Sequence, residues 1–236
     1  MQIEVISSVN EARADRFTHR TAIVIDVLRA SSTMVAALEA GAPGIFPVET
    51  VLEARALQRP GHLLAGERFC RKIPGFDLGN SPDDFTPDNL RNRHVVLTTT
   101  NGTRAVHKAM RADNILAGAL TNASACARAA AELRRDIVLL CAGNHDDFAL
   151  EDGLCAGLLI EHLQNYCSSA VETDDFGTAM LGLYKNSSNR VADTIAGAST
   201  GKRLTKMGFG RDVQRCSQVD ISSVVPRLQG DMIVNV

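Results

Sequence analysis

The first residues that could do chemistry follow the apolar run TAIVI near the start of the chain. Asp26 stands at the end of this run, and Arg29, Ser31, Ser32 and Thr33 come shortly after it. A carboxylate at a strand end can hold a hard cation, and a helix that opens with hydroxyl residues can bind an anion through its free N–H groups. An ordinary helix cap, with Asp26 paired to Arg29, explains the same residues, so both interpretations stay open.

A second turn, TTTNGTR, follows another apolar run. Threonines, an asparagine and a glycine crowd its strand-to-helix junction, and the candidate ligands there are Thr100, Asn101, Gly102, Thr103 and Arg104. Small residues let backbone N–H groups approach a phosphate or a sulfonate, and Arg can bind an oxyanion through two parallel hydrogen bonds. A cap explains one threonine but not all of them, so we predict that this turn binds an oxyanion.

Two further groups of polar residues accompany these turns. Residues 66–85 are rich in Gly, Pro, Asp and Arg, and long irregular segments of this kind are usually functional. Its candidates are Glu67, Arg68, Asp77 and Asn80, although a surface loop with solvated charges would have the same composition.

Adjacent carboxylates, Glu151 and Asp152, follow a third apolar run, DIVLLCAG. The favourable interaction of acidic side chains with the dipole at a helix start explains such a pair. Beside a phosphate site, the two would instead bind Mg²⁺, which prefers carboxylate and water oxygens. His145 is the histidine that we single out, because it lies in the same turn and the six histidines do not cluster at zinc spacing.

The elements that must position these residues alternate between strands and helices. We predict strands at 21–28, 45–48, 62–65, 94–100 and 136–143, helices at 31–41, 50–58, 188–197 and 201–208, and a terminal hairpin at 224–236. Ser31 or Ser32 would cap the helix at 31–41, and Thr86 would cap a helix that begins at Pro87.

This alternation implies βαβ units and an α/β fold, with three layers (α/β/α) and a largely parallel sheet. We find no linker, so we expect residues 1–236 to form a single domain. Three segments share a strand, a polar turn and a helix, and an internal duplication would arrange them as two similar lobes around a cleft.

Composition excludes several classes of protein. The chain has 25 Lys and Arg against 27 Asp and Glu, a net charge of -2, which argues against a nucleic-acid partner. No apolar run reaches the roughly 20 residues of a membrane-spanning helix. The first residues do not read as a signal peptide, and the cysteines are dispersed, so we expect a cytoplasmic protein with reduced thiols. The sequence leaves association into a homo-oligomer open.

One stretch resembles a phosphate-binding P-loop without meeting its requirements. GASTGK (197–202) has Ala196 where the first glycine is needed and Arg203 where Ser or Thr is needed. We therefore exclude a P-loop at this position.

Four blocks, in their order and spacing, resemble the 2-phosphosulfolactate phosphatase family. They are VIDVLRASST, GER followed by GFDLGNSP, TTTNGTRA, and CAG followed by ALEDGLCAG. Ser199, Gly208, Asp212 and Cys216 fit as well, so the resemblance covers nearly the whole chain. Two loop positions depart from the family pattern: Cys70 stands where a glycine is usual, and Asn144-His145-Asp146-Asp147 replaces another glycine.

The resemblance implies a Mg²⁺-dependent phosphatase that converts 2-phosphosulfolactate to sulfolactate and inorganic phosphate. This step belongs to coenzyme M biosynthesis in methanogens and to sulfolactate formation in some bacteria. Together with the polar turns, it assigns Mg²⁺ to Asp26, Glu151 and Asp152, and a catalytic role to Asp26, Arg29, Glu67 and Asp77. The substrate-binding candidates are Ser31, Ser32, Thr33, Arg68, Asn80, Thr100, Asn101, Gly102, Thr103 and Arg104.

Several alternatives stay open from the sequence. Either Asp26 becomes phosphorylated or a water attacks, and either Glu67 or Asp77 could protonate the leaving alkoxide. The protein could instead be a phosphatase for another small anionic phosphate monoester. A non-catalytic binder of a phosphorylated metabolite would use the same turns but leave Asp26, Glu151 and Asp152 without a role.

Overall fold

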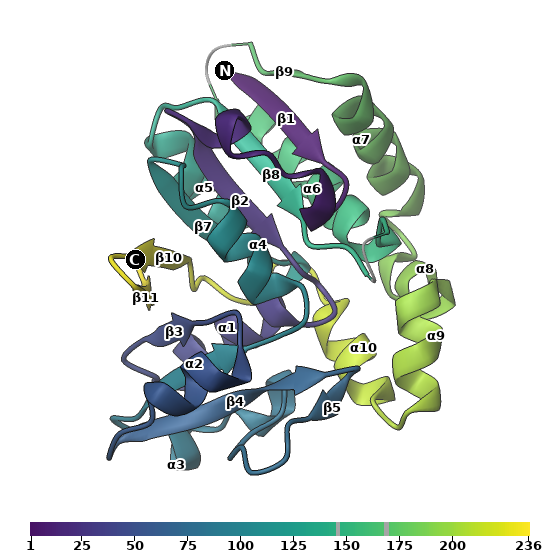
Figure 1. The fold of residues 1–236 in the computed structure, drawn as a ribbon. Coiled ribbons are helices and arrows are strands. Elements are labelled where there is room, and N and C mark those ends of the chain that lie inside the picture. Colours follow the sequence, from purple (N-terminus) through teal and green to yellow (C-terminus); the bar gives the residue numbers. More distant parts are fainter. Residues whose placement is uncertain (145–146, 168–169) are drawn as a thin grey trace.

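The computed structural model describes residues 1–144, 147–167 and 170–236, and its strands form one large sheet (Figure 1). The strands are β1 (Gln2–Ile6), β2 (Thr21–Ile25), β3 (Ile45–Pro47), β4 (His62–Arg68), β5 (Arg71–Lys72), β6 (His94–Thr98), β7 (Asn114–Gly118), β8 (Ile137–Cys141), β9 (Glu172–Thr173), β10 (Pro226–Gln229) and β11 (Met232–Asn235). The helices are α1 (Ala30–Glu39), α2 (Val51–Ala56), α3 (Pro87–Leu90), α4 (Gly102–Lys108), α5 (Ala123–Glu132), α6 (Leu150–Tyr166), α7 (Asp175–Ser187), α8 (Val191–Gly197), α9 (Ser199–Lys206) and α10 (Gly210–Cys216).

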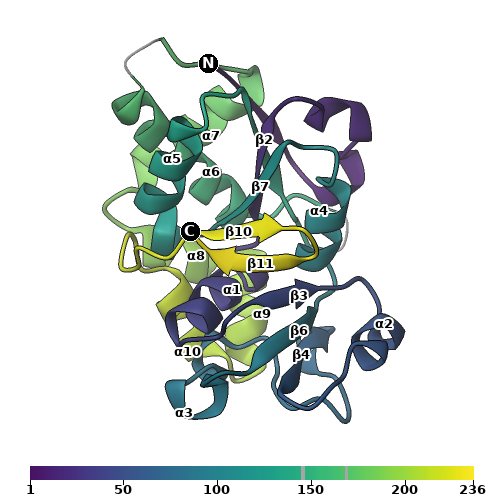
Figure 2. The same ribbon diagram turned by 90° about the vertical axis from the view of Figure 1, so that its left-hand side faces the viewer.

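The sheet consists of two parallel sections that the C-terminal hairpin joins. One section has the order β4-β6-β3 and the other has the order β7-β2-β8-β1, with short strands at the two outer edges. The hairpin β10–β11 lies between β7 and β3 and pairs antiparallel with both (Figure 2). The predicted α/β class with a largely parallel sheet is therefore confirmed, as is the terminal hairpin.

Helices cover both faces of the sheet, which gives the expected three layers. Ile23 and Ile25 of β2 pack into a cluster with α5, α6 and α7, whereas Ala22 and Val24 pack on the other face with α1 and α4. The alternation follows from the strand period of two, and every residue of β2 is buried because the strand lies inside the sheet. In the described part of the chain, no helix combines the length and the apolar character needed to cross a bilayer.

The segment at 66–85 is more regular than we expected from its composition. Strand β4 continues through Arg68 and turns into the short strand β5. Gly66 makes this continuation possible, because it pairs with Thr98 at a φ of 152° and an added Cβ would lie 2.1 Å from the Thr98 carbonyl oxygen. A glycine count alone predicts a loop, whereas here the glycine permits close strand pairing.

Helix α1 begins at Ala30, one residue before the predicted helix at 31–41. Its N-cap is Arg29, and Ser31 and Ser32 lie inside the first turn, so the prediction that a serine caps this helix is wrong. The prediction at Pro87 is confirmed, since α3 begins there and Thr86 caps it.

Candidate active site

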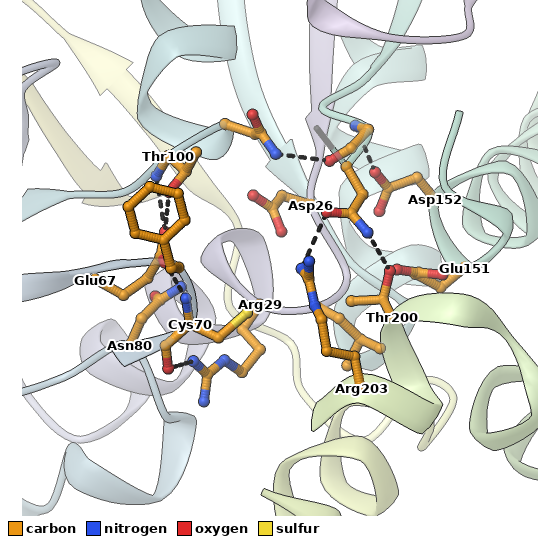
Figure 3. Close-up of a pocket in the computed structure, with 15 residues that line it drawn as sticks. Asp26, Arg29, Glu67, Cys70, Asn80, Thr100, Glu151, Asp152, Thr200 and Arg203 are labelled. Atoms are coloured by element: carbon orange, nitrogen blue, oxygen red, sulfur yellow. Dashed lines mark hydrogen bonds between the residues drawn. The ribbon is translucent and has the colours of Figure 1, made fainter. Parts of the chain in front are cut away.

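A polar cavity of about 530 Å³, part of it open to solvent, lies beyond the carboxyl ends of the parallel strands (Figure 3). This is the edge of an open parallel sheet at which ligands usually bind. The turns after β2, β4, β6 and β8 contribute to its wall, together with the start of α6 and one face of α9. The lining residues are Asp26, Leu28, Arg29, Glu67, Phe69, Cys70, Asn80, Thr100, Asn101, Gly143, Asn144, Glu151, Asp152, Thr200 and Arg203.

The three predicted metal ligands, Asp26, Glu151 and Asp152, are all buried and line this cavity. Asp152 connects two turns, because Oδ1 accepts a hydrogen bond of 2.9 Å from the Val27 N–H and Oδ2 accepts one of 3.0 Å from the Gly143 N–H. The Ala30 N–H donates to Asp26 Oδ1 at 3.1 Å. The backbone of both turns thus fixes the carboxylates in the wall.

The environment of these carboxylates opposes their negative charge. Burial raises the pKa of Asp26 to about 7, the Ala30 N–H opposes this shift, and repulsion from Glu67 and Glu151 adds to it. Burial also raises the pKa of Asp152 well above its ordinary value, and repulsion from Asp26 and Glu151 acts in the same direction. A bound cation would reverse this balance, because an opposite charge nearby favours the ionised form of a carboxylate.

The donor set fits Mg²⁺. Within residues 1–144, 147–167 and 170–236, no hydrogen bond reaches the buried Oε2 atom of Glu151 or the buried Oδ1 atom of Asn80. An oxygen buried without a hydrogen-bond partner is costly, and a ligand would satisfy both atoms. Across the same residues, no group of three or more acidic, histidine or cysteine side chains could hold a metal ion. Mg²⁺ does not need such a group, because it usually takes one or two carboxylates and completes its octahedron with water and phosphate oxygens.

Glu67 organises the opposite wall. Its Oε1 atom accepts hydrogen bonds of 2.8 Å from both the N–H and the hydroxyl of Thr100, and its Oε2 atom accepts one of 2.7 Å from the Cys70 N–H (Figure 3). The Asn101 side chain donates to the Gly143 carbonyl at 3.0 Å, which connects this wall to the turn after β8. Glu67 therefore fixes the positions of the turns after β4 and β6 relative to each other.

Arg29 is fixed at the cavity by an ion pair with Asp212, a residue of α10. The Nη1 atom of Arg29 lies 2.5 Å from Asp212 Oδ2, and both side chains are buried. Its Nη2 atom donates to the Cys70 carbonyl at 3.2 Å, and its guanidinium lies 4.4 Å from the centroid of the Phe209 ring. Arg29 pairs with Asp212 rather than with Asp26. The alternative interpretation of this turn, an ordinary helix cap with Asp26 paired to Arg29, is therefore wrong.

A third wall consists of residues that the sequence did not identify as part of a site. Asn144 accepts a hydrogen bond of 3.0 Å from Arg203 and donates one of 3.2 Å to the Thr200 hydroxyl. Burial raises the pKa of Glu151, while interactions with the Thr200 hydroxyl and with the Arg203 charge oppose that shift. The sequence feature that could have indicated these residues is the GASTGK stretch. Its place at the start of α9, beside the cavity, becomes apparent only in the folded chain.

The structure brings eight of the predicted site residues to the cavity, and others lie behind its wall. Ser31, Ser32 and Thr33 donate their hydroxyls to the carbonyls of Val24, Val27 and Asn80, and none of the three lines the cavity. Thr103 exchanges hydrogen bonds with Thr99, and Gly102 packs directly against Asp26. These residues support the turns, whereas the sequence suggested that they bind an oxyanion.

Three charged candidates point elsewhere. Arg68 donates to the Glu49 carbonyl and to the Thr98 hydroxyl, and Arg104 donates to Asn10 Oδ1 at 2.6 Å. Asp77 is exposed and accepts a hydrogen bond from the Leu64 N–H. None of the three lines the cavity. His145, which the sequence singled out, lies outside the described residues.

Nearly the whole chain is similar to known proteins. The family model for 2-phosphosulpholactate phosphatase matches residues 6–231. The chain belongs to this family. It is 38% identical to a probable 2-phosphosulfolactate phosphatase of Symbiobacterium thermophilum, over 92% of this chain and 95% of the relative. A relative with the same description from Caldanaerobacter subterraneus subsp. tengcongensis is 35% identical over 99% of this chain and 98% of its own length. Membership of the 2-phosphosulpholactate phosphatase family makes the chain a phosphoric monoester hydrolase.

Proposed function

We propose that the protein hydrolyses 2-phosphosulfolactate to sulfolactate and inorganic phosphate with the help of Mg²⁺. The observation that carries the proposal is the buried group of Asp26, Glu151 and Asp152 beside two arginines in one polar cavity. The descriptions of the relatives support the choice of substrate. A binding protein would gain nothing from three buried carboxylates at an anion site, since they repel an anionic ligand in the absence of a cation.

Asp26 and Glu151 are the residues that would hold the ion, because the Asp152 oxygens already accept backbone hydrogen bonds and Glu151 Oε2 is without a partner among the described residues. Bound there, Mg²⁺ would supply charge stabilisation to the phosphoryl oxygens and lower the pKa of a coordinated water. Asp152 holds the turns after β2 and β8 at a fixed separation. Glu67 orients Thr100, whose N–H and hydroxyl lie at the cavity, and Arg29 contributes positive charge from a fixed position.

Glu67 is the remaining candidate for the group that protonates the leaving alkoxide. The sequence offered Glu67 and Asp77 for this role, and of the two Glu67 lines the cavity. Its carboxylate is held by hydrogen bonds from Thr100 and Cys70, so it is positioned before the substrate binds. Such positioning meets one requirement of a general acid, and the group must also carry a proton when the ester bond breaks.

The proposal is tested by phosphate release from 2-phosphosulfolactate with Mg²⁺ and after treatment with EDTA. We expect turnover that EDTA abolishes and Mg²⁺ restores. Faster turnover of a sugar phosphate than of phosphosulfolactate would replace the substrate but retain the reaction. Failure of the protein to hydrolyse any small phosphate ester in the presence of Mg²⁺ would overturn the proposal.

A further inference from the structure

The tip of the β4–β5 hairpin carries an exposed aromatic ring at the cavity. The two strands pair at Arg68 and Arg71, so Phe69 and Cys70 form a two-residue turn between them. Phe69 is 76% exposed and lines the cavity. Of the large apolar side chains that are exposed in the described part of the chain, it is the one that does so.

The backbone of this turn does not favour a phenylalanine. Phe69 and Cys70 have φ values of 54° and 64°, in the left-handed region that both positions of a type I′ hairpin turn occupy. Asn, Asp and Gly adopt this conformation readily, whereas a bulky side chain rarely does. Since a ring so exposed also adds little to the hydrophobic core, neither local conformation nor packing explains the residue type at this position.

The main chain beside the ring is fixed by residues of the site. The Cys70 N–H donates a hydrogen bond of 2.7 Å to Glu67 Oε2, and the Cys70 carbonyl accepts one of 3.2 Å from Arg29 Nη2. The tip of the hairpin is therefore attached to the cavity wall. The Phe69 side chain itself is exposed, and exposed side chains change rotamer on the picosecond to nanosecond timescale, so the ring can turn toward a bound ligand.

The rest of the cavity wall is mostly polar, which gives an apolar ring a distinct use. Among the described lining residues, Leu28 and Phe69 supply the large apolar side chains. A phosphate monoester has carbon atoms beside its anionic groups, and charged groups do not stabilise that part. Contact with a phenyl ring removes apolar surface of both partners from water, and the exclusion of water strengthens the electrostatic interactions in the cavity.

We infer that Phe69 covers the carbon skeleton of the bound phosphate ester, a role that rests on the proposed function. The ring closes the solvent side of the cavity over the ester carbons, while the phosphoryl group binds to the polar side of the wall. Phe69 thus favours organic phosphate esters over inorganic phosphate, and it does not act on the bond that breaks.

The test is Phe69→Asn, because asparagine removes the ring and suits the backbone of the turn. The matched control is Leu52→Asn, since Leu52 is 78% exposed, lies on α2 and does not line the cavity. Steady-state kinetics in Mg²⁺ gives kcat and KM for phosphosulfolactate and the inhibition constant of inorganic phosphate. Differential scanning calorimetry gives the Tm of each variant.

We expect Phe69→Asn to raise KM by roughly 10- to 100-fold and to leave kcat within about 3-fold, because the apolar contact binds the ground state and the transition state alike. The inhibition constant of inorganic phosphate should change less than about 3-fold, since phosphate has no carbon atoms for the ring to cover. The Tm should be retained or raised, which separates this loss from an effect on folding. Phe69→Leu should keep part of the affinity, and Leu52→Asn should have wild-type kinetics.

A spectroscopic test is also available, because the chain contains no tryptophan. Phe69→Trp places a single fluorophore at the tip of the hairpin. Its emission should shift to shorter wavelength when sulfolactate and Mg²⁺ are added at concentrations of sulfolactate that inhibit the same variant. Leu52→Trp should show no shift.

Three results would overturn this role for Phe69. They are a wild-type KM in Phe69→Asn, an equal loss of affinity for the ester and for inorganic phosphate, and an unchanged emission of Phe69→Trp while sulfolactate inhibits it. Each differs from a failure of the proposed function, in which the wild-type protein itself would release no phosphate.

Discussion

Arg29 and Asp212 form an ion pair that joins the turn after β2 to α10, across 183 residues of sequence. The pair is buried, with 2% of the Arg29 side chain and 4% of the Asp212 side chain exposed. Ser81 donates a further hydrogen bond of 2.7 Å to Asp212 Oδ1, so both carboxylate oxygens are satisfied. The C-terminal helices are thereby attached to the part of the chain that carries Asp26.

Removing one partner of this buried pair should destabilise the protein far more than removing one partner of an exposed ion pair. Asp212→Ala leaves the Arg29 charge buried without its partner, and we expect a loss of about 3–5 kcal/mol in the free energy of unfolding. The matched control is Asp83→Ala, which removes the exposed ion pair with Arg215 and should cost about 1 kcal/mol or less. Urea denaturation measures both, and equal losses would show that the buried pair has no special role.

A second relationship determines where Asp26 can lie. An added Cβ at Gly102 would stand 2.6 Å from Asp26 Oδ2 and 2.3 Å from the Ala30 Cβ. We expect Gly102→Ala to displace Asp26, to lower kcat/KM strongly, and to destabilise the fold by about 1–3 kcal/mol through overpacking.

The control for this substitution lies on α7. Gly182 is exposed inside that helix, and an added Cβ there would meet no atom within 4 Å. Gly182→Ala should therefore leave activity unchanged and raise stability by about 0.5–1 kcal/mol, because alanine is the better helix former. If Gly102→Ala behaved like Gly182→Ala in thermal unfolding and kinetics, close packing at Gly102 would have no part in placing Asp26.

The sequence predicted those site residues that directly follow a strand. Asp26, Thr100 and Asn101 come after apolar runs of clear strand character, and the carboxyl ends of parallel strands meet at one edge of a sheet. Glu151 and Asp152 were predicted for a related reason, since they open the helix that follows β8. Local pattern and sheet topology together were sufficient for these positions.

The remaining site residues depend on information that a local pattern does not contain. Arg203 and Thr200 reach the cavity because α9 packs near the turn after β8, a tertiary contact between segments that are distant in sequence. In contrast, Ser31, Ser32 and Thr33 have the right types for an anion site, but their hydroxyls bond to backbone carbonyls. Residue type therefore indicated the turn but not the direction of its side chains.

Arg104 provides a test of that distinction. Its sequence position predicts an oxyanion ligand, whereas in the structure its guanidinium bonds to Asn10 outside the cavity. We expect Arg104→Ala to change kcat/KM by less than about 3-fold and stability by about 0.5 kcal/mol, as for an ordinary surface residue. A loss of roughly 30- to 150-fold in kcat/KM, the equivalent of about 2–3 kcal/mol, would restore the role predicted from the sequence.

Binding of Mg²⁺ should stabilise the folded protein even without a substrate. A ligand that binds only the folded protein stabilises it by RT ln(1 + [L]/Kd), or about 2.7 kcal/mol at 100 times Kd. Mg²⁺ should therefore raise the Tm of the wild-type protein, and Asp26→Asn and Glu151→Gln should each remove most of this increase. Activity should fall roughly 1,000-fold or more in both variants, since several kcal/mol of charge stabilisation is lost.

Asp77→Asn is the control for these two variants. Asp77 carries the same type of carboxylate, but it is exposed, bonds to the Leu64 N–H, and does not line the cavity. The asparagine oxygen can still accept that hydrogen bond, so both the Mg²⁺-dependent increase in Tm and the activity should be retained within about 3-fold. Differential scanning calorimetry with a Mg²⁺ titration separates the cases. An undiminished Mg²⁺ effect in Asp26→Asn and in Glu151→Gln would place the ion elsewhere in the protein.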